Sequence, residues 1–302
     1  MRKKGLTSLF ILGLFAFVIT FLSLCSTQKE QETWFKRVLI TNDDGIDSPG
    51  ITELAQAFSK VAETYVVAPN QNKSGSGDYM SVFSKGKITI EKRDMGEGIQ
   101  AYAVDGFPAD CVLIALKGIM KDNPPDVVIS GINTGANLDW AWIASGTVGA
   151  ARIAGFAGIP AIAVSGVDDD IPGALAAASH WVVRLAQSPS IQELADYQYV
   201  TADIPNIRPD EIQGVHVTQR AGLRPEFNFE KADTPEGADG SEQEVWRMTG
   251  IRGTGAAPPD DSDLAFYRKG YIVIVPMKAD EHDYKLLDKF KLDLSIFPSW
   301  EK

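Results

Sequence analysis

Apolar and polar residues follow two alternating patterns along the chain after Arg37. Short, almost continuously apolar runs predict buried strands, and longer runs with apolar residues on one face predict helices. The expected strands are residues 37–41, 64–69, 87–92, 100–106, 125–130 and 159–166. The expected helices are residues 48–63, 108–120, 148–158 and 173–187. This alternation predicts a Rossmann-like α/β fold, with three αβα layers around a mostly parallel sheet.

The regular alternation of expected strands and helices ends at about residue 200. Short strand-like pieces at 214–220, 244–250 and 270–277 are separated by acidic and Gly/Pro-rich loops. The acidic segment 230–244 predicts a solvated hairpin loop. We therefore expect one domain over residues 36–302, with a β-rich extension at about 205–280 that could form oligomer contacts.

The N-terminal segment has the layout of an export signal. A basic start precedes an uncharged apolar run from about Leu9 to Leu24, and Cys25 follows directly. This resembles a bacterial lipoprotein site, although Leu24 replaces the usual small residue. We expect residues 1–25 to be a lipoprotein-like signal, residues 26–35 a tether, and the protein to be exported and membrane-anchored or periplasmic. An uncleaved anchor and ordinary secretion are alternatives.

Composition excludes several classes of function. The 302-residue chain carries a formal charge of −11, and without the three N-terminal cations this becomes −14. Such an acidic body repels a phosphate backbone, so we expect no nucleic-acid polymer as partner and membrane contact only through the N-terminal segment. The histidines, His180, His216 and His282, are far apart in sequence, which argues against a histidine-based zinc site.

Three polar loops follow apolar strands in this pattern. These loops comprise residues 42–45 (NDDG), 70–81 and 131–137 (GINTGAN). The carboxyl ends of parallel strands meet at one edge of a sheet, so these loops should converge. Asp43 and Asp44 repel each other unless something positive lies beside them. Carboxylate, hydroxyl and amide oxygens together suit one Mg²⁺ or Mn²⁺ ion.

A second group of polar residues, Ser145, Gly146 and Thr147, leads directly into an expected helix. The N–H groups at a helix N-terminus are favourable for phosphate. A cation beside a phosphate predicts phosphoryl chemistry, in which a metal-activated water attacks phosphorus. Each segment alone also fits an ordinary turn, a flexible connector or a helix cap without a ligand. The prediction depends on their joint position at one edge.

Five segments resemble the SurE (survival protein E) family of metal-dependent nucleotidases. In order, they are LITNDDGIDSPGI, VVAPNQNKSGSG, VDGFPADCV, VVISGINTGANL and SGTVGAA. The resemblance runs from about Arg37 to Met277. It implies a homodimer or homotetramer that hydrolyses nucleoside 5′- and 3′-monophosphates to nucleoside and phosphate, using one divalent Mg²⁺ or Mn²⁺ ion.

The resemblance also implies roles for individual residues. The metal ligands would be Asp43, Asp44, Ser74 and Asn133. Asp43 and Asp44 would also be the catalytic residues. The substrate and phosphate side of the site would comprise Asn42, Asn137, Ser145, Gly146 and Thr147.

Two features depart from the family. The segment LDWAWIA replaces residues that are commonly acidic or polar, and an export signal is unusual in a family described as intracellular. Trp140 and Trp142 could stack a nucleobase at the mouth of a pocket or pack at a subunit contact. Two other functions stay open: a phosphatase with a covalent aspartyl-phosphate, and an exported nucleotide-binding lipoprotein without turnover.

Overall fold

The structure is a computed structural model that describes residues 33–232, 244–252 and 256–282. The chain divides into two units, Met1–Trp34 and Phe35–Lys302, and the second contains all elements described below. The expected signal, most of the tether and most of the 230–244 loop lie outside the described residues. Among the residues that the structure describes, no helix has the length and apolar character needed to cross a bilayer.

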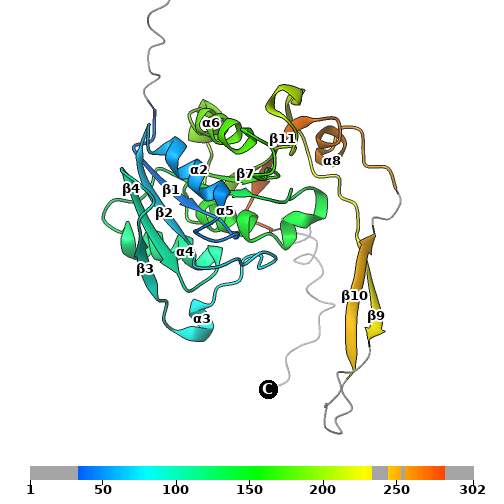
Figure 1. The fold of residues 1–302 in the computed structure, drawn as a ribbon, viewed down its shortest axis with the longest axis horizontal. Coiled ribbons are helices and arrows are strands. Elements are labelled where there is room, and N and C mark those ends of the chain that lie inside the picture. Colours follow the sequence, from blue (N-terminus) through cyan, green and yellow to red (C-terminus); the bar gives the residue numbers. More distant parts are fainter. Residues whose placement is uncertain (1–32, 233–243, 253–255, 283–302) are drawn as a thin grey trace, which may run out of the picture. The chain divides into compact units, whose positions relative to one another are not determined.

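A nine-stranded sheet forms the middle layer of the second unit (Figure 1). Its strands are β1 (Arg37–Thr41), β2 (Glu63–Pro69), β3 (Ile90–Arg93), β4 (Ile99–Val104), β5 (Val127–Asn133), β6 (Ala161–Ser165), β7 (Gln198–Asp203), β8 (Gly214–Val217) and β11 (Tyr271–Lys278). The order is β3-β4-β2-β1-β5-β6-β7-β11-β8. Only the β3–β4 and β7–β11 pairs are antiparallel, which confirms the mostly parallel sheet.

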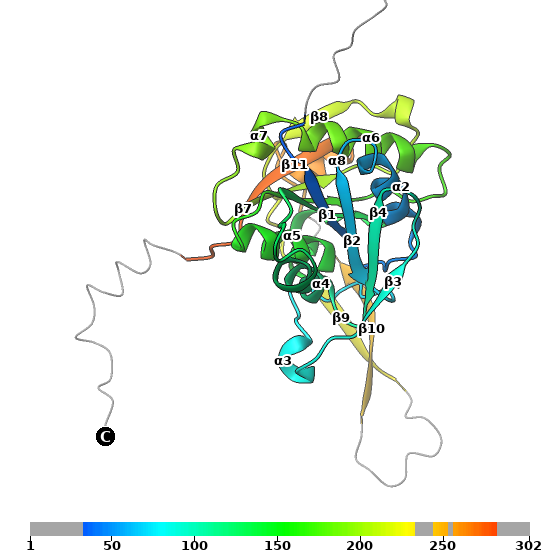
Figure 2. The ribbon, with the colours of Figure 1, turned by 90° about the vertical axis from the view of Figure 1, so that its left-hand side faces the viewer.

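Helices cover both faces of this sheet. The longer ones are α2 (Pro49–Phe58), α4 (Pro108–Ile114), α5 (Gly146–Phe156) and α6 (Ala174–Ala186). The short ones are α3 (Val82–Lys85), α7 (Pro189–Gln192), α8 (Asp263–Tyr267), the 3-10 turns η2 (Asp139–Ile143) and η3 (Pro209–Glu211), and the π-helical turn η1 (Ala115–Ile119) that continues α4. Helix α2 packs against α6 on one face and α4 against α5 on the other (Figure 2), which confirms the αβα layers.

The apolar runs of the sequence account for the central strands. Val38, Leu39 and Ile40 of β1 are fully buried because helices cover both sides of this strand. Leu39 belongs to a core cluster that includes Val128 of β5 and residues of α4 and α5. This packing fixes where the central strands end, and therefore where their loops begin.

Two strands differ from the expectation. β7 has the sequence QYVTAD and was not expected, since its polar residues interrupt the apolar pattern. It forms because it pairs with two neighbouring strands of the sheet, β6 and β11. The second is β9 (Glu226–Ala232), which pairs antiparallel with β10 (Val245–Arg252) in a separate two-stranded sheet. β8 and β11, by contrast, join the main sheet.

Candidate active site

Five neighbouring strands bring polar loops to one edge of the sheet. β2, β1, β5, β6 and β7 run parallel, so their carboxyl ends lie at the same edge. A pocket of about 350 Å³ opens there, within the size range of small-molecule sites. Its lining comprises Asp43, Asp44, Ser74, Gly75, Asn133, Thr134, Gly135, Ala136, Asn137, Trp140, Ala141, Ala144 and Ser145.

Asp43 is anchored to the N-terminus of α5. The N–H of Gly146 donates to Asp43 Oδ2 at 3.1 Å, and the hydroxyl of Thr147 donates to Asp43 Oδ1. A Cβ atom at Gly146 would lie 2.8 Å from the Cβ of Asp43 and 2.6 Å from Ser76 Oγ, so this close approach requires glycine. Burial raises the pKa of Asp43, and these hydrogen bonds oppose the shift.

Asp44 is more accessible than its neighbour and faces the pocket. The N–H of Thr134 donates to Asp44 Oδ2 at 3.2 Å, which ties the β1 loop to the β5 loop. Burial raises the pKa of Asp44 to about 6, with further contributions from the negative charges of Asp43 and Asp168. A bound cation would reverse this effect, because it would favour the carboxylate.

Ser74 and Asn133 bring neutral oxygen atoms to the same pocket as the two aspartates. The side-chain amide of Asn133 donates to the carbonyl oxygen of Gly135, which leaves its Oδ1 atom for another partner. Two carboxylates, a hydroxyl and an amide oxygen fit the preference of Mg²⁺ and Mn²⁺. No group of three His, Cys, Asp or Glu side chains suited to a metal occurs within the described residues. The fit therefore depends on the neutral oxygens as well.

The predicted phosphate-side residues divide into two sets. Asn137 and Ser145 line the pocket. Asn42, Gly146 and Thr147 are buried behind it. Asn42 holds the β1 turn by donating to the carbonyl oxygen of Gly45 and to Ser48 Oγ, at 3.0 and 2.8 Å. Direct contact of these three residues with phosphate stays a prediction. In the structure, each of them makes a hydrogen bond that holds part of the site in place.

Ser145 caps helix α5, which is one of the alternatives that the sequence left open. The hydroxyl of Ser145 accepts a hydrogen bond of 3.1 Å from the N–H of Val148. A hydroxyl has a second lone pair and a proton besides the lone pair used in this bond, and Ser145 also lines the pocket. The same residue can therefore cap the helix and contact a ligand.

A buried charged network behind the pocket was missed from the sequence. The guanidinium of Arg220 donates to Asp263 Oδ2 at 3.0 Å and to the carbonyl oxygen of Asn137 at 2.7 Å. Asp203 accepts a bond of 2.6 Å from the N–H of Asn137, and burial raises the pKa of Asp203 to about 6. Asp263 also accepts a bond of 2.7 Å from the N–H of Asp139. No local motif marks these residues, because they meet only after folding.

Another buried carboxylate, Asp110, organises the loop that carries Ser74. It accepts hydrogen bonds from the N–H and hydroxyl of Ser81, at 2.9 and 2.7 Å, and from the N–H groups of Val82 and Phe107, at 3.1 and 3.0 Å. Its position within VDGFPADCV was the available sequence signal. Asp110 thus joins the end of the Ser74 loop to α4.

The two tryptophans of the unusual segment have different surroundings. Trp140 is half-buried, lines the pocket, and lies edge-on to Phe227, with ring centroids 5.5 Å apart. Trp142 packs against the core, and the guanidinium of Arg152 lies 4.9 Å from the centroid of its ring. Trp142 is therefore a packing residue, and Trp140 belongs to the pocket.

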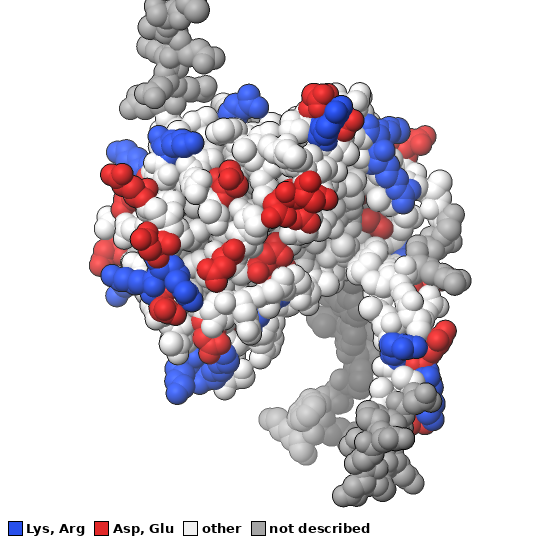
Figure 3. All heavy atoms as spheres, in the orientation of Figure 1, with Lys and Arg blue, Asp and Glu red and all other residues white. Residues whose placement is uncertain are grey.

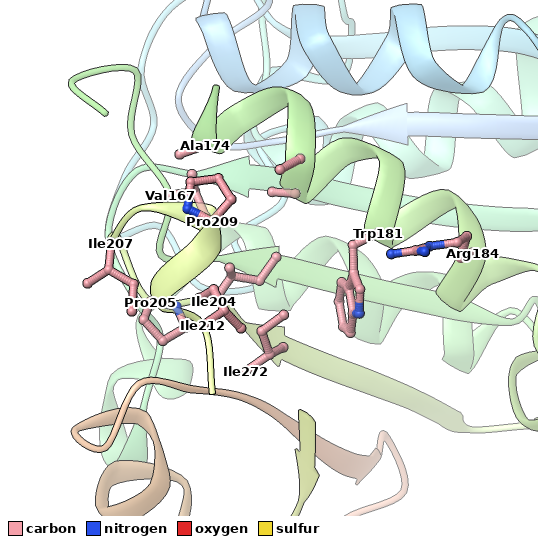
Figure 4. A pocket seen from close by; sticks show the side chains of 12 residues that line it. Val167, Ala174, Trp181, Arg184, Ile204, Pro205, Ile207, Pro209, Ile212 and Ile272 are labelled. Atoms are coloured by element: carbon pink, nitrogen blue, oxygen red, sulfur yellow. The ribbon is translucent and has the colours of Figure 1, made fainter. Parts of the chain in front are cut away.

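Two other pockets among the described residues have different linings. A pocket of about 180 Å³ beside α6 has a mostly apolar lining that includes Trp181, Ile204 and Ile272, together with Arg184 and no carboxylate or hydroxyl side chain (Figure 4). A groove between the starts of α2 and α6 has acidic side chains, among them Asp47 and Asp169. Acidic side chains also gather near the centre of the face in Figure 3, a surface that disfavours anions unless a cation is present.

Comparison with known proteins identifies the family. The family model described as "Survival protein SurE" matches residues 38–225. The chain belongs to the SurE family. Relatives in this family include the protein named 5′-nucleotidase SurE from Petrotoga mobilis, which is 34% identical over 259 residues, covering 86% of this chain and 99% of the relative. The namesake from Alkaliphilus metalliredigens is 35% identical over 255 residues, covering 84% of this chain and 97% of the relative.

A solved SurE structure confirms the fold. The SurE protein from Aquifex aeolicus superposes with a TM-score of 0.70 and 29% sequence identity, covering 85% of this chain and 99% of that protein. The α/β fold expected from the alternating pattern is thereby confirmed.

Proposed function

We propose that this SurE protein is a phosphomonoesterase that hydrolyses nucleoside 5′- and 3′-monophosphates with one bound Mg²⁺ or Mn²⁺ ion. The observation that carries the proposal is the pocket in which Asp43, Asp44, Ser74 and Asn133 meet at the edge of the sheet. The relatives named 5′-nucleotidase SurE support the same substrate class. The activity toward 3′-monophosphates rests on the resemblance alone.

The charge of the pocket supports the metal. Its lining includes two aspartates, and none of its described lining residues is Lys, Arg or His. A phosphate dianion entering such a site would meet only negative charge and neutral dipoles, which is unfavourable without a cation. When bound, the divalent ion polarises the phosphoryl group and offsets these charges.

The side chains of the protein supply orientation and proton handling. The hydrogen bonds from Gly146 and Thr147 fix the carboxylate of Asp43, so its position is set before substrate arrives. Asp44 is the accessible carboxylate and is the better placed of the pair to exchange a proton with the pocket. Ser145 and Asn137 contribute polar groups on the phosphate side.

Phosphate release from nucleoside 5′- and 3′-monophosphates tests the proposal, using the full-length chain and two variants. Asp44→Asn removes a pocket carboxylate, whereas Asp47→Asn removes an exposed carboxylate three positions away that does not line the pocket. We expect phosphate release to fall by at least about 100-fold in Asp44→Asn and to persist in Asp47→Asn. Equal activity of Asp44→Asn and the wild type would contradict the assignment.

We also propose that the protein is exported and held at a membrane through a lipidated Cys25. The support is the sequence of residues 1–25, a basic start followed by an apolar run and a cysteine. Mass spectrometry of the N-terminus of the protein from a bacterial membrane fraction tests this: a diacylglyceryl-modified Cys25 is expected, and an intact N-terminal methionine would contradict it.

We further propose a homodimer or homotetramer that uses the β9–β10 hairpin. Paired residues of its two strands place Phe229 opposite Met248 and Phe227 opposite Ile251, so these four side chains share one face. All four are between 44% and 56% exposed. A two-stranded sheet with such a face is poorly stable in water alone, which favours coverage by another subunit.

A further inference from the structure

The lining of the pocket contains two chemically different sets of residues. Asp43, Asp44, Ser74 and Asn133 are hydrophilic, whereas Trp140, Ala141 and Ala144 present an aromatic ring and methyl groups to the same space. A site for a simple phosphate ester needs only the first set. An aromatic wall inside the same pocket indicates a ligand with a flat, weakly polar part attached to its phosphate.

The turn that carries Trp140 is fixed from behind. Its first residue, Asp139, has a φ of 50°, in the left-handed region that is unfavourable for most residues other than glycine. Two hydrogen bonds hold it there: its N–H donates to Asp263 Oδ2 at 2.7 Å, and its Oδ1 accepts from the N–H of Leu223 at 2.9 Å. The ring of Trp140 is therefore presented by a turn that the buried network keeps in place.

A second aromatic residue supports the ring from the side. Phe227, at the base of β9, meets Trp140 edge-on, with 76° between the ring planes, and is itself 50% exposed. An edge-to-face contact of this kind holds the indole in one orientation beside the pocket that it lines. Trp142, two residues along the same turn, packs against Arg152 and the core, so its ring is not available to stack on a ligand.

We propose that Trp140 is the residue that binds the nucleobase, stacking on it while the phosphate lies beside the aspartates of the same pocket. This inference rests on the proposed nucleotidase function and adds the residue that distinguishes a nucleotide from a phosphate ester without a base. Base–aromatic stacking tolerates different bases, because every base presents a flat face. Trp140 thus confers preference for nucleotides as a class.

The test compares two substrates across four forms of the full-length protein. Adenosine 5′-monophosphate carries a base, and ribose 5-phosphate has the same reacting group without one. The variants are Trp140→Ala, Trp140→Phe, which keeps a flat ring, and Phe83→Ala. Phe83 lies on α3, is 85% exposed and is absent from the pocket lining, so its variant controls for loss of an exposed aromatic side chain.

In Trp140→Ala, we expect KM for adenosine 5′-monophosphate to rise about tenfold or more, with kcat/KM for ribose 5-phosphate within about twofold of the wild type. Trp140→Phe should restore most of the loss, and Phe83→Ala should match the wild type. An unchanged KM for the nucleotide in Trp140→Ala would overturn the inference. An equal loss for both substrates would also overturn it, because it would show a structural role.

A binding measurement separates this inference from the proposed function. Adenosine, which has no phosphate to release, is titrated into the wild type and Trp140→Ala by calorimetry. Weaker binding to the variant supports stacking even if neither substrate is hydrolysed, an outcome that would refute only the nucleotidase activity. Equal binding to both proteins, or none at millimolar adenosine, would refute the role of Trp140 while leaving phosphate release as a separate result.

Discussion

At the scale of single residues, the paired aspartates are held differently. Both oxygens of Asp43 accept hydrogen bonds from the start of α5, whereas Asp44 accepts from Thr134 and faces the pocket. The site therefore contains a fixed carboxylate beside an adaptable one. Substitutions that disturb Asp43 and substitutions that disturb Asp44 should therefore have different effects.

Gly146→Ala should reduce kcat/KM by about 100-fold, since an added methyl group would displace Asp43 by a fraction of an ångström to an ångström. The fold should survive, because alanine is favourable in a helix. Steady-state phosphate release measures the loss. Gly250→Ala is the control, since a Cβ atom there meets nothing within 4 Å. Unchanged activity in Gly146→Ala would show that the position of Asp43 is unimportant.

Asp44→Asn should stabilise the metal-free protein at about pH 7 but not at about pH 4. The raised pKa of Asp44, about 6, means that the folded protein holds this proton more tightly than the unfolded chain. Its protonated form therefore contributes stability that is present below the unfolded pKa and lost as pH rises through about 6. Asparagine stays neutral at every pH, so the variant keeps this contribution to stability as pH rises.

Melting temperatures in chelator, measured across this pH range, check the prediction. The difference between Asp44→Asn and the wild type should grow to a few degrees as pH rises. Asp47→Asn, an exposed carboxylate outside the pocket, serves as the control. A difference that is constant with pH would show that Asp44 is not destabilised by its surroundings.

At the scale of elements, the loop after β5 depends on a charged network contributed by distant segments. Arg220 lies beyond β8, Asp263 begins α8 and Asp203 ends β7, yet all three contact residues of this loop or one another. The loop carries Asn133, Asn137 and Trp140. Its shape is thus set by parts of the chain that carry no motif of their own.

Arg220→Met should destabilise the protein by about 3–5 kcal/mol, because two buried carboxylates would lose their cationic partner. Activity should fall as well, since Asn137 loses a hydrogen bond at its carbonyl oxygen. Urea unfolding gives the free energy of unfolding. Arg224→Met, at an exposed arginine four positions away, is the control and should change it little. An unaltered unfolding midpoint in Arg220→Met would refute the anchoring role.

The sequence predicted the central elements and failed where support comes from outside an element. β1, β2, β5 and β6 were evident because strands covered on both faces are continuously apolar. β7 was not, since Thr201 and Asp203 are polar residues buried by partners from other segments. The aspartates were found for their adjacency and the Arg220 network was not, because its hydrogen-bonded residues are up to 124 positions apart.

At the scale of the whole molecule, the β9–β10 hairpin is the feature that the main sheet does not explain. Its apolar face includes Phe229 and Met248, and its base reaches the pocket through Phe227 and Trp140. If another subunit covers this face, assembly and the nucleobase side of the site are linked through one element. The two properties can be tested on the same variants.

Phe229→Glu should lower the molecular mass in solution, because a carboxylate on the apolar face would oppose subunit contact. Asn228→Glu introduces the same side chain on the opposite face of the strand and should leave the mass unchanged. Sedimentation equilibrium measures both. Equal masses for the wild type and Phe229→Glu would place the subunit contact elsewhere.

Phosphate release from adenosine 5′-monophosphate by the full-length protein, first in chelator and then after Mg²⁺ or Mn²⁺ is restored, tests the metal-dependent site most directly. We expect no release in chelator, recovery with either ion, and no recovery in Asp43→Ala. Release that continues undiminished in chelator, or that Asp43→Ala retains in full, would contradict a metal-dependent site built on the aspartate pair.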